Sequence, residues 1–200
     1  GERRFSSLRA IFCGTAALEP TLYARVREMF GPVVRVTYGK SEVFNPITVL
    51  EAEETDAWYS SGGQDACVGW PAPGVEIVIR GDGGKPVATG DGGEVLIRAQ
   101  HLMMGYRTAE GFSPLGPNEF HETGDLGYVD ARGRLHLTGR SADIIKSGGY
   151  KVAPGEVERL LAPALQPSEV AAVGIPSAYW GEVILAAIEN PATGWEERMD

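Results

Sequence analysis

A short β-hairpin is the feature of this sequence that most restricts its fold. Residues 126–138 form two short strands around the turn residues Asp130-Ala131-Arg132-Gly133, a composition typical of a tight turn between antiparallel strands. Such a hairpin brings its outer ends, Asp125 and Arg140, towards the same place. A carboxylate accepts hydrogen bonds from a diol, and a guanidinium offers several donors in a fixed fork. The pair therefore suits a ribose, although a lone Asp–Arg pair is also typical of a surface salt bridge that closes a hairpin.

The amino-terminal part of the chain predicts a strand–helix–strand unit. Residues 8–12 are an apolar run, Pro20 suits the first turn of a helix that stops at Gly31, and residues 33–37 are rich in β-forming side chains. Each predicted strand leads into a loop with polar or small residues. In open α/β sheets ligands tend to bind at this edge.

The rest of the chain predicts a turn-rich antiparallel region and then a second unit. Residues 75–80 and 94–99 read as strands, and a Gly-rich turn lies between them. After Arg140, the sequence predicts a hairpin around residues 147–149, a helix opened by Pro154 with Val157, Leu160 and Leu161 on one face, and strands at 170–175 and 183–188. We therefore expect a mixed α+β fold with two domains, residues 1–140 and 141–200.

Charge and composition exclude several classes of protein. The formal net charge of −9 argues against binding to nucleic acid, which needs clustered Lys and Arg. No apolar run reaches the length of a membrane span. Cys13 and Cys67 lack metal-ligand spacing, so we expect a reduced, cytoplasmic chain. The three histidines, at positions 101, 121 and 136, are scattered and are expected on the surface or in turns.

Two loops after the predicted strands carry candidate binding residues. Tyr38-Gly39-Lys40-Ser41-Glu42 offers an aromatic ring for a base, a hydroxyl for a phosphate oxygen and a carboxylate for Mg²⁺. Gly14-Thr15-Ala16 could let the backbone approach a flat ligand closely. Taken alone, each loop is more typical of an ordinary turn.

The combination of motifs resembles the adenylate-forming superfamily, which contains acyl-CoA synthetases, adenylation domains of peptide synthetases and luciferases. The resemblance covers nearly the whole chain, and its last motif is long enough to be specific. The motifs are, in chain order, Gly14-Thr15-Ala16, Tyr38 to Glu42, Thr123-Gly124-Asp125, and GRSADIIKSGGYKVAPGEVE from Gly139 to Glu158.

The resemblance implies an enzyme that activates a carboxylic acid with ATP as acyl-AMP and then transfers the acyl group to CoA. By similarity, Gly14, Thr15 and Ala16 would line the adenine and acyl pocket, and Tyr38, with Gly39, would lie against the adenine. The catalytic residues would be Ser41, which contacts the α-phosphate, and Glu42, which holds Mg²⁺.

The resemblance also assigns residues around the hairpin and beyond it. Asp125 and Arg140 would hold the ribose hydroxyls. Lys146, Gly148 and Gly149 would bind cofactor, because the turn at residues 147–150 looks like the loop that approaches the CoA arm. The run from Ile144 to Val152 looks most like small-acid synthetases, including those for malonate.

Some residues depart from the family pattern. Ala142 stands at the hinge position, which usually holds Asp or Lys, and Lys40 stands where a neutral residue is more usual. Lys40 would either assist the phosphates or point to solvent. The chain also lacks a Ser/Thr/Gly-rich phosphate loop upstream, and no lysine follows Lys151.

These absences predict a carboxyl-side fragment: the end of the large domain and the beginning of the small one. We expect the isolated chain to be inactive and its exposed apolar edges to favour self-association. Two alternatives stay open, an adenylation domain that loads a carrier protein and a non-catalytic nucleotide-binding relic of the fold.

Overall fold

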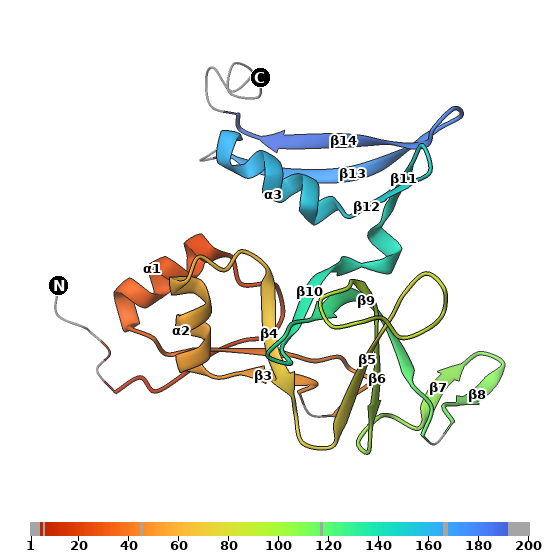
Figure 1. The fold of residues 1–200 in the computed structure, drawn as a ribbon, viewed down its shortest axis with the longest axis horizontal. Coiled ribbons are helices and arrows are strands. Elements are labelled where there is room, and N and C mark those ends of the chain that lie inside the picture. Colours follow the sequence, from red (N-terminus) through yellow and green to blue (C-terminus); the bar gives the residue numbers. More distant parts are fainter. Residues whose placement is uncertain (1–4, 6, 45, 117, 166–167, 192–200) are drawn as a thin grey trace. The chain divides into compact units, whose positions relative to one another are not determined.

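The computed structural model describes residues 5, 7–44, 46–116, 118–165 and 168–191. Its contacts divide the chain into two units (Figure 1). Unit 1 comprises residues 1–123 and 127–137, and unit 2 comprises residues 124–126 and 138–200. The fold is mixed α+β, as the sequence predicts. Among the described residues, no helix has both the length and the apolar character needed to cross a bilayer.

Unit 1 begins with the predicted strand–helix–strand segment. Strand β1 (Ile11–Cys13) pairs in parallel with β2 (Val34–Tyr38), and helix α1 (Pro20–Phe30) joins them. Proline at the first helical position loses no hydrogen bond, since the first N–H groups of a helix have no partner within it. Gly31 ends the helix with φ of 84°, a conformation that costs glycine little. The first strand is shorter than the apolar run at residues 8–12 predicts.

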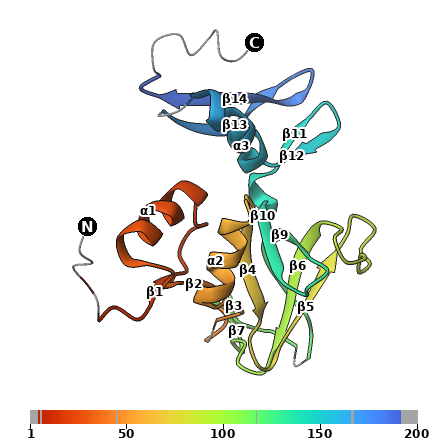
Figure 2. The ribbon, with the colours of Figure 1, turned by 60° about the vertical axis from the view of Figure 1, so that its left-hand side comes forward.

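The remaining strands of unit 1, two of which also contribute residues to unit 2, extend one large sheet. Helix α2 (Ala52–Ser60) packs, like α1, against β2 (Figure 2). Its first turn contains Glu53 and Glu54, whose negative charges the helix dipole favours there. The further strands are β3 (Thr48–Leu50), β4 (Ala66–Pro71), β5 (Val75–Arg80), β6 (Gly93–Ala99), β9 (His121–Val129) and β10 (Leu135–Arg140). The sheet order is β1-β2-β3-β4-β10-β9-β6-β5, and a separate hairpin consists of β7 (Gly105–Thr108) and β8 (Gly111–Pro114).

A continuous apolar core holds unit 1 together. Ile47, Leu50, Val95, Ile97 and Leu135 have no exposed surface, and each such side chain stabilises the fold by about 1.5–3 kcal/mol relative to an exposed one. Cys67 lies in the same core with 1% of its surface exposed, and burial raises the pKa of its thiol.

The turn of the β9–β10 hairpin is closed by one carboxylate. Asp130 Oδ1 accepts hydrogen bonds from the backbone N–H groups of Arg132 and Arg134, both at 2.9 Å. Asp130 Oδ2 lies 2.8 Å from Arg134 Nε and 3.1 Å from His136 Nε2. Burial opposes ionisation of Asp130, but these donors outweigh it and lower its pKa to about 2. The turn that the sequence predicts at residues 130–133 is therefore present, with an ionised carboxylate at its centre.

The prediction that His136 lies on the surface or in a turn is wrong. Its ring is 1% exposed and stacks on Tyr128, with the ring centroids 4.7 Å apart. Trp58 meets the same ring edge-on at 4.9 Å. Burial lowers the pKa of His136, and the neighbouring Asp130 opposes that shift. The ring is thus a neutral core residue whose Nε2–H donates to Asp130.

Unit 2 is a small sheet with one helix. Its 3₁₀ turn η1 (Ser141–Asp143) precedes the hairpin of β11 (Ile145–Ser147) and β12 (Tyr150–Val152). Helix α3 (Pro154–Leu165) then leads to the long antiparallel pair β13 (Glu169–Ser177) and β14 (Gly181–Glu189). The sheet order is β12-β11-β14-β13, and α3 packs on β13.

Helix α3 is present where the sequence predicts it. Leu160, which the helical period places on one face with Val157 and Leu161, is nevertheless 70% exposed, whereas Leu165 at the end of the helix is fully buried. The packed face is fixed instead by contacts such as the hydrogen bond from Ala172 N to Glu158 Oε1, at 2.9 Å.

We predict that Asp130→Asn destabilises unit 1 by about 2–3 kcal/mol at pH 7, because the charge-assisted hydrogen bonds to Arg134 and His136 are weakened. Urea unfolding followed by circular dichroism measures this difference. The folded pKa of about 2 lies below the ordinary 3.8, so the carboxylate stabilises the wild type above pH 4. That stabilisation is lost as the pH falls towards 2, and the difference between the two proteins should shrink over the same range.

Asp91→Asn is the matched control, because Asp91 is exposed on the loop before β6. It should unfold like the wild type. Equal stability of Asp130→Asn and Asp91→Asn at pH 7 would contradict a structural role for the carboxylate.

Candidate functional site

The two loops that the sequence singles out in unit 1 lie at one edge of the sheet. Strands β1 and β2 are parallel, with Cys13 paired to Val36, so the residues that follow them emerge side by side. A Cβ atom added to Gly14 would lie 2.6 Å from the Thr37 hydroxyl oxygen. A side chain at position 14 would therefore displace the Thr37 hydroxyl, and glycine leaves it in place. Thr15 and Ala16 are exposed beside it.

Tyr38 is less accessible than a ring that covers a base would need to be. It is 7% exposed and belongs to the core of unit 1. Gly39 and Ser41, by contrast, are exposed. The structure thus gives Tyr38 a packing role, and its contact with an adenine stays a prediction.

Glu42 is held by a segment that the sequence does not point to. Its carbonyl accepts a hydrogen bond from Met103 N at 2.8 Å, and Val43 forms an isolated antiparallel bridge with Leu102. The Tyr106 hydroxyl lies 3.3 Å from Glu42 Oε1. Burial and this carboxylate both raise the pKa of Tyr106. Nothing in the local sequence signals the contact, because the residues are 64 positions apart.

The side chain of Lys40 forms a hydrogen bond within unit 1 and does not point to solvent. Its Nζ donates to the carbonyl oxygen of Thr123 at 2.6 Å, in a partly buried position. The Thr123 hydroxyl in turn donates to the Val95 carbonyl at 2.7 Å. Within unit 1, therefore, the loop after β2 is tied to strands β9 and β6.

Unit 2 contains the Asp–Arg pair at the base of the hairpin. Arg140 Nε lies 3.4 Å from Asp125 Oδ1. The Asp125 side chain is 9% exposed and the Arg140 side chain 68% exposed. The pair thus combines a buried carboxylate with an accessible guanidinium.

The turn at residues 147–150 is a two-residue hairpin loop. Ser147 pairs with Tyr150, and Gly148 and Gly149 have φ values of 57° and 86°. Positive φ at both loop residues is the requirement of a type I′ turn, which favours Gly-Gly. Gly148 N donates to the Trp180 carbonyl at 2.9 Å, and the indole ring lies beneath the loop. Lys146 is exposed on β11, and its backbone N–H donates to Glu182.

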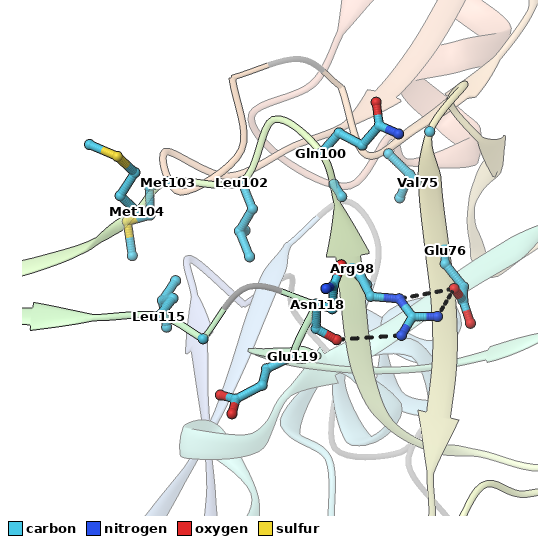
Figure 3. A pocket seen from close by; sticks show the side chains of 13 residues that line it. Val75, Glu76, Arg98, Gln100, Leu102, Met103, Met104, Leu115, Asn118 and Glu119 are labelled. Atoms are coloured by element: carbon cyan, nitrogen blue, oxygen red, sulfur yellow. Dashed lines mark hydrogen bonds and ion pairs between the residues drawn. The ribbon is translucent and has the colours of Figure 1, made fainter.

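A separate groove of about 860 Å³ opens in unit 1 (Figure 3). One wall carries Leu102, Met103, Met104 and Leu115, and the other carries polar side chains, including the Arg98–Glu76 ion pair. The predicted site residues do not line this groove. Its wall continues, however, into the segment that bridges Val43 and contacts Glu42.

No three acidic, His or Cys side chains gather into a ready-made metal site in the part of the chain that the structure describes. Mg²⁺ does not need such a cluster, since it usually retains several waters and binds one or two carboxylates together with substrate phosphates. The single carboxylate of Glu42 fits that mode of binding.

Comparisons with known proteins identify the family. A family model described as AMP-binding enzyme matches residues 1–107. An indoleacetate–CoA ligase from Aromatoleum aromaticum is 33% identical over 184 residues, which are 92% of this chain and 35% of that protein. The chain therefore belongs to the family of AMP-binding enzymes, and it spans about a third of the length of this curated relative.

Solved structures show the same fold. The amide bond synthetase McbA from Marinactinospora thermotolerans superposes with a TM-score of 0.78 at 33% identity, over 96% of this chain and 40% of that one. The o-succinylbenzoate CoA synthetase from Bacillus subtilis, solved in complex with the acyl-adenylate intermediate OSB-AMP, superposes with a TM-score of 0.73 at 29% identity. The match covers 94% of this chain and 38% of that one. These similarities confirm the adenylate-forming superfamily that the motifs predict.

We predict that Gly148→Ala destabilises unit 2 by about 1–2 kcal/mol, because the positive φ is strained for alanine. The added Cβ would also lie 2.9 Å from Trp180 Cε3. Thermal unfolding measured by circular dichroism tests this. Gly83→Ala is the control, since its Cβ would meet nothing within 4 Å. If both variants melt like the wild type, the turn does not depend on glycine.

Proposed function

We propose that this chain forms part of an ATP-dependent carboxylate–CoA ligase. In the reaction, a carboxylate oxygen attacks the α-phosphorus of ATP, and pyrophosphate leaves. The thiol of CoA then attacks the acyl carbon of the mixed anhydride, and AMP leaves with the electrons of the broken C–O bond. The activation is needed because oxide is a poor leaving group and AMP is a good one.

The observation that carries the proposal is the Asp125–Arg140 pair. The carboxylate of Asp125 is 9% exposed, and the side chain of Arg140, whose Nε lies 3.4 Å away, is 68% exposed and so accessible to a ligand. A ribose can insert its two hydroxyls as donors to the carboxylate and as acceptors from the guanidinium. The guanidinium carries five N–H donors, so Arg140 can contact a ribose hydroxyl as well as Asp125.

The remaining contacts to ATP are proposed for the loops of unit 1. Ser41 is exposed and would donate its hydroxyl to the α-phosphate, and Glu42 would hold Mg²⁺. The metal would neutralise charge on the transferring phosphoryl group. Gly14, Thr15 and Ala16 would line the adenine and acyl pocket, with Tyr38 and Gly39 against the base.

The CoA side of the site is proposed for unit 2. The exposed Gly148-Gly149 turn would approach the pantetheine arm, since glycines there leave the backbone open to a ligand. Lys146 is exposed and carries a charge that suits a phosphate. We place the boundary of the nucleotide-binding and mobile domains at residue 140, with domains 1–140 and 141–200.

The same proposal includes the setting of the protein. Both cysteines are free thiols, as expected in the reducing cytoplasm. Exposed apolar side chains on β13 and β14, such as Val173 and Leu185, support self-association of the chain.

A second candidate acceptor follows from the comparisons. The chain is as similar to an amide bond synthetase as to an indoleacetate–CoA ligase, at 33% identity in each case. An amine can also attack the acyl carbon of acyl-AMP, so an amine acceptor is the alternative to CoA. A carrier-protein thiol is the third possibility, and small dicarboxylates are one class of acid that the motif at residues 144–152 suggests.

We predict that the chain binds AMP and that Asp125→Asn weakens this binding about tenfold or more, because an amide accepts hydrogen bonds from the diol less strongly than a carboxylate. Isothermal titration calorimetry measures both constants. A 2′,3′-dideoxy analogue of AMP should bind the two proteins equally, since it lacks the hydroxyls.

Asp143→Asn is the matched control, as Asp143 is exposed on the neighbouring 3₁₀ turn. It should bind AMP like the wild type. Absence of AMP binding by the wild type would sink the proposed function, and equal loss with both nucleotides would sink the assignment of Asp125 to the ribose.

We also predict that Glu42→Gln removes the Mg²⁺-dependent part of ATP binding and leaves metal-free AMP binding unchanged, because a neutral amide is a poor ligand for Mg²⁺. Titration of ATP with and without Mg²⁺ measures the difference. Glu119→Gln, in the separate groove (Figure 3), is the control. An unchanged Mg²⁺ effect in Glu42→Gln would assign the metal elsewhere.

A further inference from the structure

Lys40 is the residue of the nucleotide-binding loop that neither the family pattern nor the proposed roles explain. It lies two residues after strand β2, and its ammonium donates to the Thr123 carbonyl at 2.6 Å. The two residues are 83 positions apart in the sequence. The contact is partly buried, so water competes with it less than at an exposed site.

Thr123 is a fixed anchor for this contact. It is 5% exposed, and its hydroxyl donates to the carbonyl of Val95, which is fully buried in β6. Its carbonyl is therefore presented from a rigid strand. A hydrogen bond from a charged donor to such a group is roughly twice as strong as a neutral one.

The position of that carbonyl determines the orientation of the next peptide. The peptide bond is planar and trans, so the Thr123 C=O and the Gly124 N–H point in opposite directions. Gly124 then takes φ of 72°, a region that glycine can enter and leave easily. Gly124 stands within strand β9 between Thr123 and the carboxylate of Asp125, so the conformation of this stretch depends on how the neighbouring peptides are held.

We propose that Lys40 is a positioning residue for the ribose-binding carboxylate. By holding the Thr123 carbonyl, its ammonium fixes the Thr123–Gly124 peptide and so reduces the number of orientations available to Asp125. This inference rests on the proposed nucleotide site. Within unit 1, the same cation connects the loop that carries Ser41 and Glu42 to Thr123 of strand β9. The competing role is direct attraction of the phosphates.

The two roles predict different responses to the phosphate group. We expect Lys40→Met to lower the affinity for adenosine and the affinity for AMP by the same factor, because both ligands share the ribose. The expected factor is about tenfold, as for loss of a charge-assisted hydrogen bond. Lys40→Arg should restore most of the affinity, since a guanidinium can also donate to a single carbonyl. Calorimetric titration of each variant with adenosine and with AMP supplies the comparison.

Three outcomes would overturn the proposal. Loss of affinity for AMP alone would show that Lys40 acts on the phosphate. Unchanged affinity for both ligands would show that the contact does not position the site. Equal loss in Lys85→Met would attribute the effect to net charge, because Lys85 is an exposed lysine in the turn before β6.

A second readout does not require any ligand. Hydrogen exchange at the Gly124 amide, followed by NMR, should accelerate in Lys40→Met and stay close to the wild-type rate in Lys40→Arg and Lys85→Met. Unchanged exchange in Lys40→Met would overturn the positioning role even if nucleotide affinity fell. If the wild type bound neither adenosine nor AMP, the proposed function would fail, and the exchange rates would still decide whether Lys40 orders this peptide.

Discussion

The carboxylate of Asp130 is the constraint on which the rest of unit 1 depends. It accepts two backbone hydrogen bonds across the turn and also binds the Arg134 guanidinium. Through His136 it reaches Tyr128 and Trp58, and so connects the turn to helix α2 and the core. A tight turn closed in this way fixes the register of β9 and β10, which carry Asp125 in the middle of β9 and Arg140 at the end of β10. The positions of Asp125 and Arg140 in the candidate site therefore depend on the geometry of this turn.

Local signals in the sequence were sufficient for several of these elements. Pro20 and Gly31 bracket a helix because each meets a backbone requirement that depends only on neighbouring residues. Asp130 and Gly133 form a tight turn for the same reason, and Gly148 and Gly149 form a hairpin loop that needs two positive φ angles. The motif order likewise placed the chain in its superfamily, and the matching family model agrees.

The features that the sequence could not reveal depend on distant partners. His136 is buried because Tyr128 and Trp58 enclose its ring, and nothing in its immediate neighbourhood indicates this. Leu160 has the apolar side chain of a packed residue, but 70% of its surface is exposed. Lys40 is unusual for the family pattern, and the sequence shows this. Its acceptor, the Thr123 carbonyl on β9, lies 83 positions away and can be identified only from the structure.

Cys67 gives the core of unit 1 a property of a different kind. Its thiol is enclosed opposite His136 in the β4–β10 ladder, and its raised pKa keeps the nucleophilic thiolate scarce. Alkylating reagents can reach the sulfur only when these strands separate. The rate at which Cys67 is alkylated therefore reports how often the sheet opens at this position. The native thiol itself is the probe, so no label has to be introduced into the protein.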